Sequence, residues 1–133
     1  MESGKIGIRL ASGKSKRIWE GLVASVASRY NCSFGFYVHD KKVADVRIAN
    51  GVVSTTKYTD DALYLPFGRV PDHRVTRKTI DLFYEEHCVP RHRSNIREYL
   101  DHFGLEAFDA FALCRITNGV MEGEPYRIEW YDA

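Results

Sequence analysis

Two stretches in the first half of the chain alternate hydrophobic and polar residues, and a Thr-rich stretch follows them. Residues 33–39 and 43–49 alternate with the period of a half-buried strand, and residues 52–58 are rich in Val and Thr. Asn50-Gly51 separates the last two stretches and favours the left-handed backbone of a type I′ turn. We therefore expect an antiparallel β meander here.

Three further segments read as strands. Residues 5–10 and residues 126–131 also alternate, so each is expected to be a short strand with one buried face. Residues 63–68 begin extended and run into Pro66, which cannot donate to a ladder. We therefore predict an edge strand at residues 63–68.

Apolar residues recur at helical spacing in four other segments. These segments are residues 16–30, residues 75–88, a helix opening at Arg93 or Ser94 and reaching Phe103, and residues 105–117. Pro90 and Gly104 are typical residues to follow helix ends, and Asn118-Gly119 is expected to stop the last helix.

These elements predict one compact α+β domain over residues 1–133, with an antiparallel β meander packed against about four helices. An apolar share of 44% in 133 residues is enough to bury a core without a metal or a disulfide. The cysteines Cys32, Cys88 and Cys114 are odd in number and far apart, which favours free thiols in a reducing compartment. We expect no cofactor and no metal.

Neither a membrane span nor a leader is expected from the sequence. No run of about 18 apolar residues occurs, and the first residues lack a charged start followed by an apolar core. The expected location is the cytoplasm of a bacterial host.

The net charge of +1 hides an uneven distribution along the chain. Residues 1–97 hold 17 Lys and Arg against 10 Asp and Glu, a net charge of +7, whereas residues 98–133 carry a net charge of −6 from 2 Arg and 8 acidic residues. Such a division predicts either a polar binding surface or two halves that neutralise each other across the fold.

Basic residues concentrate between positions 69 and 97. The set is Arg69, His73, Arg74, Arg77, Lys78, Arg91, His92, Arg93 and Arg97. Arginine favours two-pronged contacts with phosphate or carboxylate groups. We expect the three arginines between positions 91 and 97 to share one exposed face and to meet the negative charge of a partner.

Sequence motifs for catalysis are weak. Gly13-Lys14-Ser15 lies between a predicted strand and a predicted helix, but a phosphate-binding loop needs a glycine at position 8, where Ile8 stands. Glu85, Glu86 and His87 are adjacent, so they point in different directions on a helix. We therefore expect a protein without enzymatic activity.

The C-terminal sequence "CVPRHRSNIREYLDHFGLEAFDAFALCRITNGVMEGEPYRIEW" resembles small proteins of Firmicutes genomes and mobile elements, whose motif order recurs beside or within HipA-like proteins. The matching positions are Pro90, Arg93, Asn95, Leu100, Gly104, Leu105, Phe108, Asp109, Thr117, Gly119, Ile128 and Trp130, and "ALYLPFG" at 62–68 fits the same proteins. Glu124 and Arg127 stand about where those proteins carry Asp and Trp. No kinase motif is present, so HipA-like phosphotransfer is not implied.

The resemblance implies a phage or mobile-element protein that binds a host protein or ribonucleoprotein complex, with a CRISPR effector (Cas) nuclease as a candidate target, as for anti-CRISPR proteins. The residues expected to contact the partner are Arg74, Arg77, Lys78, Arg91, Arg93, Arg97, Glu122 and Glu124. The acidic residues after position 97 are candidates for mimicking phosphate. The alternative is a nucleic-acid-binding regulator that uses the basic segment 69–97.

Overall fold

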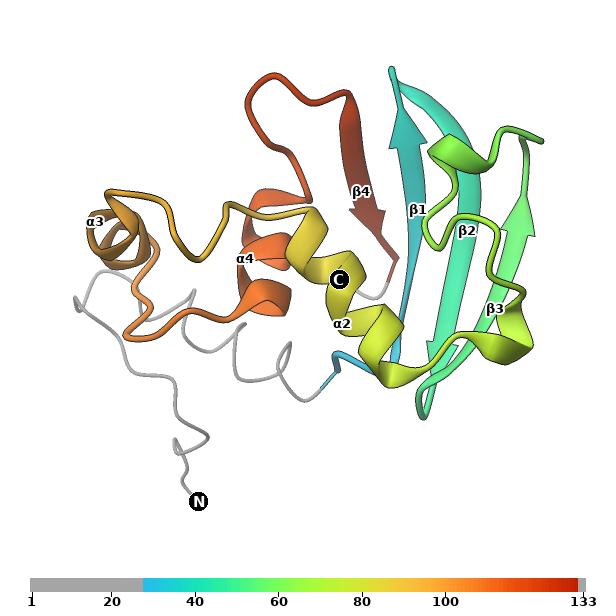
Figure 1. The fold of residues 1–133 in the computed structure, drawn as a ribbon, viewed down its shortest axis with the longest axis horizontal. Coiled ribbons are helices and arrows are strands. Elements are labelled where there is room, and N and C mark those ends of the chain that lie inside the picture. The colour runs from blue at the N-terminus through green and yellow to red at the C-terminus, as the bar shows by residue number, and fades with distance from the viewer. Residues whose placement is uncertain (1–27, 132–133) are drawn as a thin grey trace.

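The structure is a computed structural model that describes residues 28–131 of the chain (Figure 1). Its strands are β1 (Cys32–Val38), β2 (Lys41–Ala49), β3 (Val52–Lys57) and β4 (Tyr126–Trp130). Its α-helices are α2 (Arg77–Glu86), α3 (Ile96–His102) and α4 (Ala110–Thr117), and the short 3-10 helices are η3 (Ala62–Tyr64) and η4 (Asp72–Arg74). The strands predicted at 33–39, 43–49, 52–58 and 126–131 are confirmed within a residue or two of their ends.

The four strands form one antiparallel sheet in the order β3-β2-β1-β4. Two tight hairpins join the first three strands, and their turn residues have positive φ. Asn50 and Gly51 have φ values of 50° and 78°, as the predicted type I′ turn requires. The last strand returns after three helices to pair with β1, which makes β4 an edge strand of the sheet.

Alternation along the strands gives the sheet one buried face. Phe34 and Phe36 of β1 are buried beside Val46 of β2 and Ile128 of β4, while the residues between them point to the opposite face. Helices α2 and α4 lie on the buried face (Figure 1). The molecule is therefore an α+β domain, as the alternation predicted.

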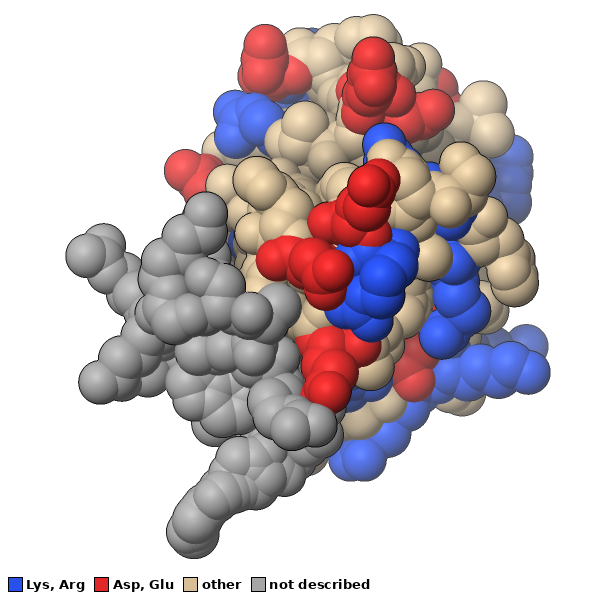
Figure 2. All heavy atoms as spheres, turned by 90° about the vertical axis from the view of Figure 1, so that its left-hand side faces the viewer, with Lys and Arg blue, Asp and Glu red and all other residues tan. Residues whose placement is uncertain are grey.

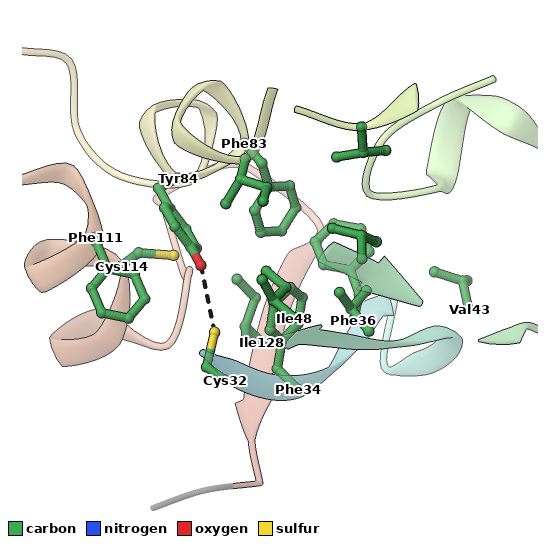
Figure 3. Packing of buried hydrophobic residues seen from close by; sticks show 14 of the residues in the cluster. Cys32, Phe34, Phe36, Val43, Ile48, Phe83, Tyr84, Phe111, Cys114 and Ile128 are labelled. Carbon is green, nitrogen blue, oxygen red and sulfur yellow. Dashed lines mark hydrogen bonds between the residues drawn. The ribbon is translucent and has the colours of Figure 1, made fainter. Parts of the chain in front are cut away.

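Helix α2 crosses the sheet and supplies the centre of the core (Figure 3). The Phe83 ring lies 5.5 Å from Phe34 and 5.6 Å from Phe36. Tyr84 contacts α4, with its ring 4.6 Å from that of Phe111. Phe67, in the segment between β3 and α2, covers the other side of Phe83 at 5.4 Å. Aromatic pairs at these separations contribute beyond simple burial, so α2 is held on the sheet from several directions.

A second apolar cluster lies on the far side of α4 from the sheet. Its buried members are Cys88, Val89, Leu100, Leu105, Ala112 and Leu113. Helix α3 packs here and has no place on the sheet (Figure 1). Helix α4 therefore has two buried sides, which explains why Phe111, Ala112, Leu113 and Cys114 are all buried in succession.

Polar caps set the ends of the longer helices. Thr76 accepts a hydrogen bond from the Thr79 N–H at 3.2 Å at the start of α2. Asp109 accepts from the Ala112 N–H at 3.0 Å at the start of α4, and Asn118, at φ 55°, ends α4 in the left-handed conformation. Such caps satisfy backbone groups that have no partner inside the helix. The predicted stop at Asn118-Gly119 is confirmed.

Two predicted elements differ from the structure. Residues 63–68 are not an edge strand, because Asp61 accepts from the Leu63 N–H at 3.0 Å and caps the short helix η3. The helix predicted at 105–117 begins only at Ala110, because the Asp109 cap sets its start and the Leu105 N–H bonds to the Leu100 carbonyl at 2.9 Å. Both errors come from side-chain or turn hydrogen bonds that compete with regular structure.

Some predictions fall outside the described residues. The strand at 5–10 lies there, as does the helix at 16–30 apart from residues 28–30, which form a turn. Residues 28–131 hold three α-helices, so the expected number of about four is not confirmed. No helix of the part described is both long and apolar enough to cross a membrane.

Candidate binding surface

The structure distributes the eight predicted contact residues over three places. Arg74, Arg77 and Lys78 lie at the start of α2, Arg91, Arg93 and Arg97 lie beyond its end, and Glu122 and Glu124 lie between α4 and β4. A helix of 10 residues is about 15 Å long, so α2 separates the two basic groups. All eight side chains belong to exposed residues, but they do not form one patch.

The group at the start of α2 is partly engaged within the fold. The Arg77 guanidinium lies over the Tyr30 ring at 4.6 Å from its centroid, and its side chain also covers Gly51 of the β2–β3 turn. The side chains of Arg74 and Lys78 make no hydrogen bond or ion pair with any residue between positions 28 and 131. Arg77 therefore helps to hold the turn against α2, whereas the charges of Arg74 and Lys78 are unpaired within the described residues.

Arg97 acts as an internal clamp. Its guanidinium forms an ion pair with Asp101 at 2.9 Å and donates to the backbone carbonyls of Leu105 and Glu106. These carbonyls lie in the linker between α3 and α4. The planar guanidinium spreads its donors over three nitrogen atoms in a fixed fork and so reaches all three acceptors, whereas a lysine carries its donors on one nitrogen. Arg97 is therefore engaged within the fold, while its side chain stays exposed, and its contact with a partner stays a prediction.

The guanidinium groups of Arg91 and Arg93 each lie over an aromatic ring. The Arg91 guanidinium is 4.4 Å from the centroid of Phe108, and that of Arg93 is 4.9 Å from the centroid of Tyr99. Neither forms an ion pair with a carboxylate of the described chain, although Arg93 donates to the Asn95 side chain at 2.6 Å. A stacked guanidinium keeps its N–H edges free for an anion, and the ring restricts its motion. The sequence did not indicate these pairs, because the helical spacing of apolar residues predicts core positions for Tyr99 and Phe108.

The charge division along the chain does not become two charged halves of the molecule. Arg29 forms an ion pair with Asp109 at 3.0 Å, and the Arg97–Asp101 pair also joins a base of the first part to an acid of the second. On the side of the molecule that carries α3, acidic and basic side chains lie next to one another (Figure 2). The two segments therefore neutralise each other in part across the fold.

A polar cluster around Asp45 lies on the face of the sheet opposite the core, and the sequence analysis did not predict it. Asp45 accepts hydrogen bonds from the hydroxyls of Tyr58 at 2.7 Å and Tyr131 at 2.6 Å, and Lys42 lies 3.4 Å from its carboxylate. Partial burial acts to raise the pKa of Asp45, but these hydrogen bonds outweigh it and hold the pKa below its ordinary value. The Tyr131 hydroxyl also covers Gly35, where a Cβ would collide with it. These contacts stiffen the sheet face.

The thiol groups are buried. Cys32, Cys88 and Cys114 are free of disulfides and lie in the two cores. Burial, with the nearby charges of Glu85 and Asp109, raises the pKa of Cys88 to about 12, and burial also raises the pKa of Cys114. Because the thiolate is the nucleophilic form, these positions do not favour thiol chemistry.

His87 is also buried, at the end of α2. Its ring lies 4.6 Å from that of Phe83 and 5.1 Å from that of Phe36, and burial lowers its pKa to about 4. Its neighbours in sequence, Glu85 and Glu86, are exposed, so the three residues do not converge. Within residues 28–131, no group of three or more His, Cys, Asp or Glu side chains could hold a metal ion. Phe36, Phe83 and Tyr126 surround His87, which makes it a core residue.

Comparison with protein-family models, with curated proteins and with solved structures finds no match to this chain.

Proposed function

We propose that this chain is a binding protein that docks on an acidic surface of a host protein or ribonucleoprotein complex through Arg91 and Arg93. The observation that carries the proposal is the position of the two guanidinium groups on Phe108 and Tyr99, without a carboxylate partner in the described chain. A charged group held in place before binding loses less conformational entropy when a partner arrives. Arginines on aromatic supports are also frequent among the residues that dominate protein interfaces.

The chemistry of the buried groups supports binding rather than catalysis. A nucleophilic or general-base mechanism needs a reactive group that the substrate can reach. Cys88, Cys114 and His87 lie in the cores, where burial disfavours the thiolates and the imidazolium. The exposed arginines Arg91 and Arg93 cannot lose a proton at physiological pH, so they recognise charge without transferring protons.

The proposed target is a complex of a bacterial host, and the sequence resemblance makes a CRISPR effector nuclease the first candidate. Tagged protein should be used to capture complexes from bacterial lysate at low and at high salt, and purified effector nucleases should be assayed for DNA cleavage with and without the chain. Recovery of one stoichiometric complex, or inhibition of one effector at an equimolar ratio, is the expected result. A chain that recovers no complex and inhibits no effector would contradict the proposal.

Two double variants that remove the same charge at opposite ends of α2 show which basic group contacts the partner. We expect Arg91→Gln with Arg93→Gln to lose the partner or the inhibition, because each charge-assisted contact contributes about 1.5–3 kcal/mol. Arg74→Gln with Lys78→Gln removes the same charge at the other end of α2 and should keep the interaction. Equal loss in both double variants would indicate a response to overall charge and would refute a docking site at Arg91 and Arg93.

The second candidate function is nucleic-acid binding by the segment 69–97. It is favoured by Arg74 and Lys78, which are exposed and lack ion pairs with the described residues. On duplex DNA, affinity should then fall with salt with a slope near −0.9 per phosphate contacted. Gel retardation with DNA and RNA tests this function, and the Arg74→Gln, Lys78→Gln variant should show the greater loss. Unchanged mobility of both nucleic acids with the unmodified chain would exclude it.

A further inference from the structure

The hairpin between β1 and β2 has a backbone that is unusual for its residues. His39 and Asp40 have φ values of 51° and 64°, although neither is a glycine. A two-residue loop of type I′ requires this conformation at both central positions. His and Asp tolerate it better than most residues, but two in succession carry a conformational cost. Conformations of this kind are enriched near functional sites.

A β-bulge next to this hairpin redirects the following side chains. Phe36 pairs with Ala44 while Tyr37 pairs with Lys42, so Val43 is an extra residue in β2. Val43 and Ala44 are both buried as a result, and the strand alternation before them shifts by one position. Lys41, opposite Val38, is thereby directed to the rim of the buried face instead of the open face of the sheet.

The hairpin, the bulge and the segment after β3 together form a cavity of about 290 Å³. Its lining consists of Val38, His39, Lys41, Lys42, Val43, Tyr58, Thr59 and Tyr64. The two valines are the apolar part of the lining. The polar part consists of two lysines, a histidine and three residues with hydroxyl groups, and the lining contains no carboxylate. The cavity is therefore complementary in charge to an anion.

Two of the lining donors have no partner among residues 28–131, and a third keeps its proton available. Lys42 and Tyr58 are engaged by Asp45, at 3.4 Å and 2.7 Å. The Lys41 ammonium and the Tyr64 hydroxyl make no hydrogen bond or ion pair with a described residue. The Thr59 hydroxyl accepts from the Asp61 N–H at 3.2 Å, which leaves its own proton able to donate. Donors therefore remain on both sides of the cavity.

We propose that this cavity binds the phosphate group of a small phosphate monoester, with Lys41, Tyr64 and Thr59 as donors. A dianionic phosphate offers three acceptor oxygens, which matches three donors on separate elements. The volume is at the lower end of ligand cavities, so a small ester fits better than a polymer. The cavity does not include Arg91 or Arg93, so this proposal can be tested independently of the proposed function.

Phenyl phosphate is a suitable probe, because it combines a dianionic phosphate with a compact apolar body for the two valines. Titration followed by backbone amide NMR should give saturable shifts centred on residues 39–43, 59 and 64. Sodium sulfate at matched ionic strength and a dinucleotide phosphodiester serve as comparison ligands. Both should bind at least fivefold more weakly.

Lys41→Gln should weaken phenyl phosphate binding about tenfold or more, because a charge-assisted hydrogen bond is lost. Tyr64→Phe should weaken it severalfold and provides a second test if Lys41→Gln is unstable. Lys57→Gln removes an exposed lysine of β3 outside the cavity and should bind like the unmodified chain.

Three results would overturn the proposal: no saturable shift, equal affinity for the phosphodiester, or equal effects of Lys41→Gln and Lys57→Gln. None of them bears on the capture and inhibition experiments, because those depend on Arg91 and Arg93.

Discussion

The imidazole of His87 lies 5.2 Å from the ring of Tyr126, almost perpendicular to it at 85°. This contact joins the end of α2 to β4, and the Nδ1 atom of His87 is buried without a hydrogen-bond partner in the described part of the chain. No carboxylate of residues 28–131 offsets the desolvation of a charged imidazole at this position. The position is therefore suited to the neutral form alone.

Stability should fall in mild acid because of His87. Its pKa is lowered by burial to about 4 in the folded chain, against an ordinary value of 6.5. The unfolded chain therefore binds the proton more readily, so the stabilisation is complete above pH 6.5 and is lost as the pH falls towards 4. The full effect is about 3 kcal/mol. Urea unfolding between pH 7.5 and 4 measures it.

Other groups also titrate between pH 7.5 and 4, so a variant is needed to isolate the contribution of His87 to the free energy of unfolding. His87→Phe should flatten the dependence between pH 6.5 and 4, whereas the exposed His92→Gln should leave it unchanged. If His87→Phe and the unmodified chain lose stability in parallel, the buried imidazole is not the cause.

Loss of Arg97 should destabilise the α3–α4 linker. Arg97→Ala removes one exposed ion pair and two hydrogen bonds to carbonyls, so we expect a loss of about 1–2 kcal/mol. Arg97→Lys should recover only a small part, because an ammonium cannot reach all three acceptors. Thermal unfolding of both variants, with Arg74→Ala as an exposed control, measures the difference. Full recovery by lysine would contradict the clamp.

Two glycines with similar backbones should differ in their tolerance of alanine. Gly119 and Gly123 have φ values of 67° and 83°, so each substitution costs about 1 kcal/mol from conformation. A Cβ at Gly119 would lie 2.8 Å from the Ile128 side chain, whereas one at Gly123 would meet nothing within 4 Å. We expect Gly119→Ala to cost at least 1 kcal/mol more than Gly123→Ala. Equal losses in chemical unfolding would show that the turn adjusts freely.

The three thiols should resist modification in the folded chain. Cys32, Cys88 and Cys114 are buried, and the raised pKa of Cys88, about 12, leaves little thiolate at neutral pH. An aromatic disulfide reagent should react with all three only at the rate of unfolding, and at once in denaturant. Rapid reaction of one thiol under native conditions would indicate an opening that exposes it.

Local patterns identified the strands because their causes are local. Alternation in 33–39 and 43–49, and the Asn50-Gly51 pair, act through neighbouring residues and through one buried face. The strand predicted at residues 63–68 is wrong, since Asp61 caps the 3-10 helix at Ala62–Tyr64 where the apolar run begins.

The candidate sites depended on contacts between residues distant in sequence. Arg91 contacts Phe108 only after the helices are packed, and Lys41 and Tyr64 line one cavity only after the hairpin is packed beside η3. The bulge at Val43 is likewise a property of two paired strands, not of either one alone.

The sequence by itself determined the class of fold, the tight turns and the concentration of basic residues between 69 and 97. Only the tertiary structure decided which of those bases remain available, because availability depends on what packs beside each side chain. Arg97 is neutralised by Asp101 and by carbonyls of the next linker, whereas Arg93, four residues earlier, lies on a ring with its charge unpaired among the described residues.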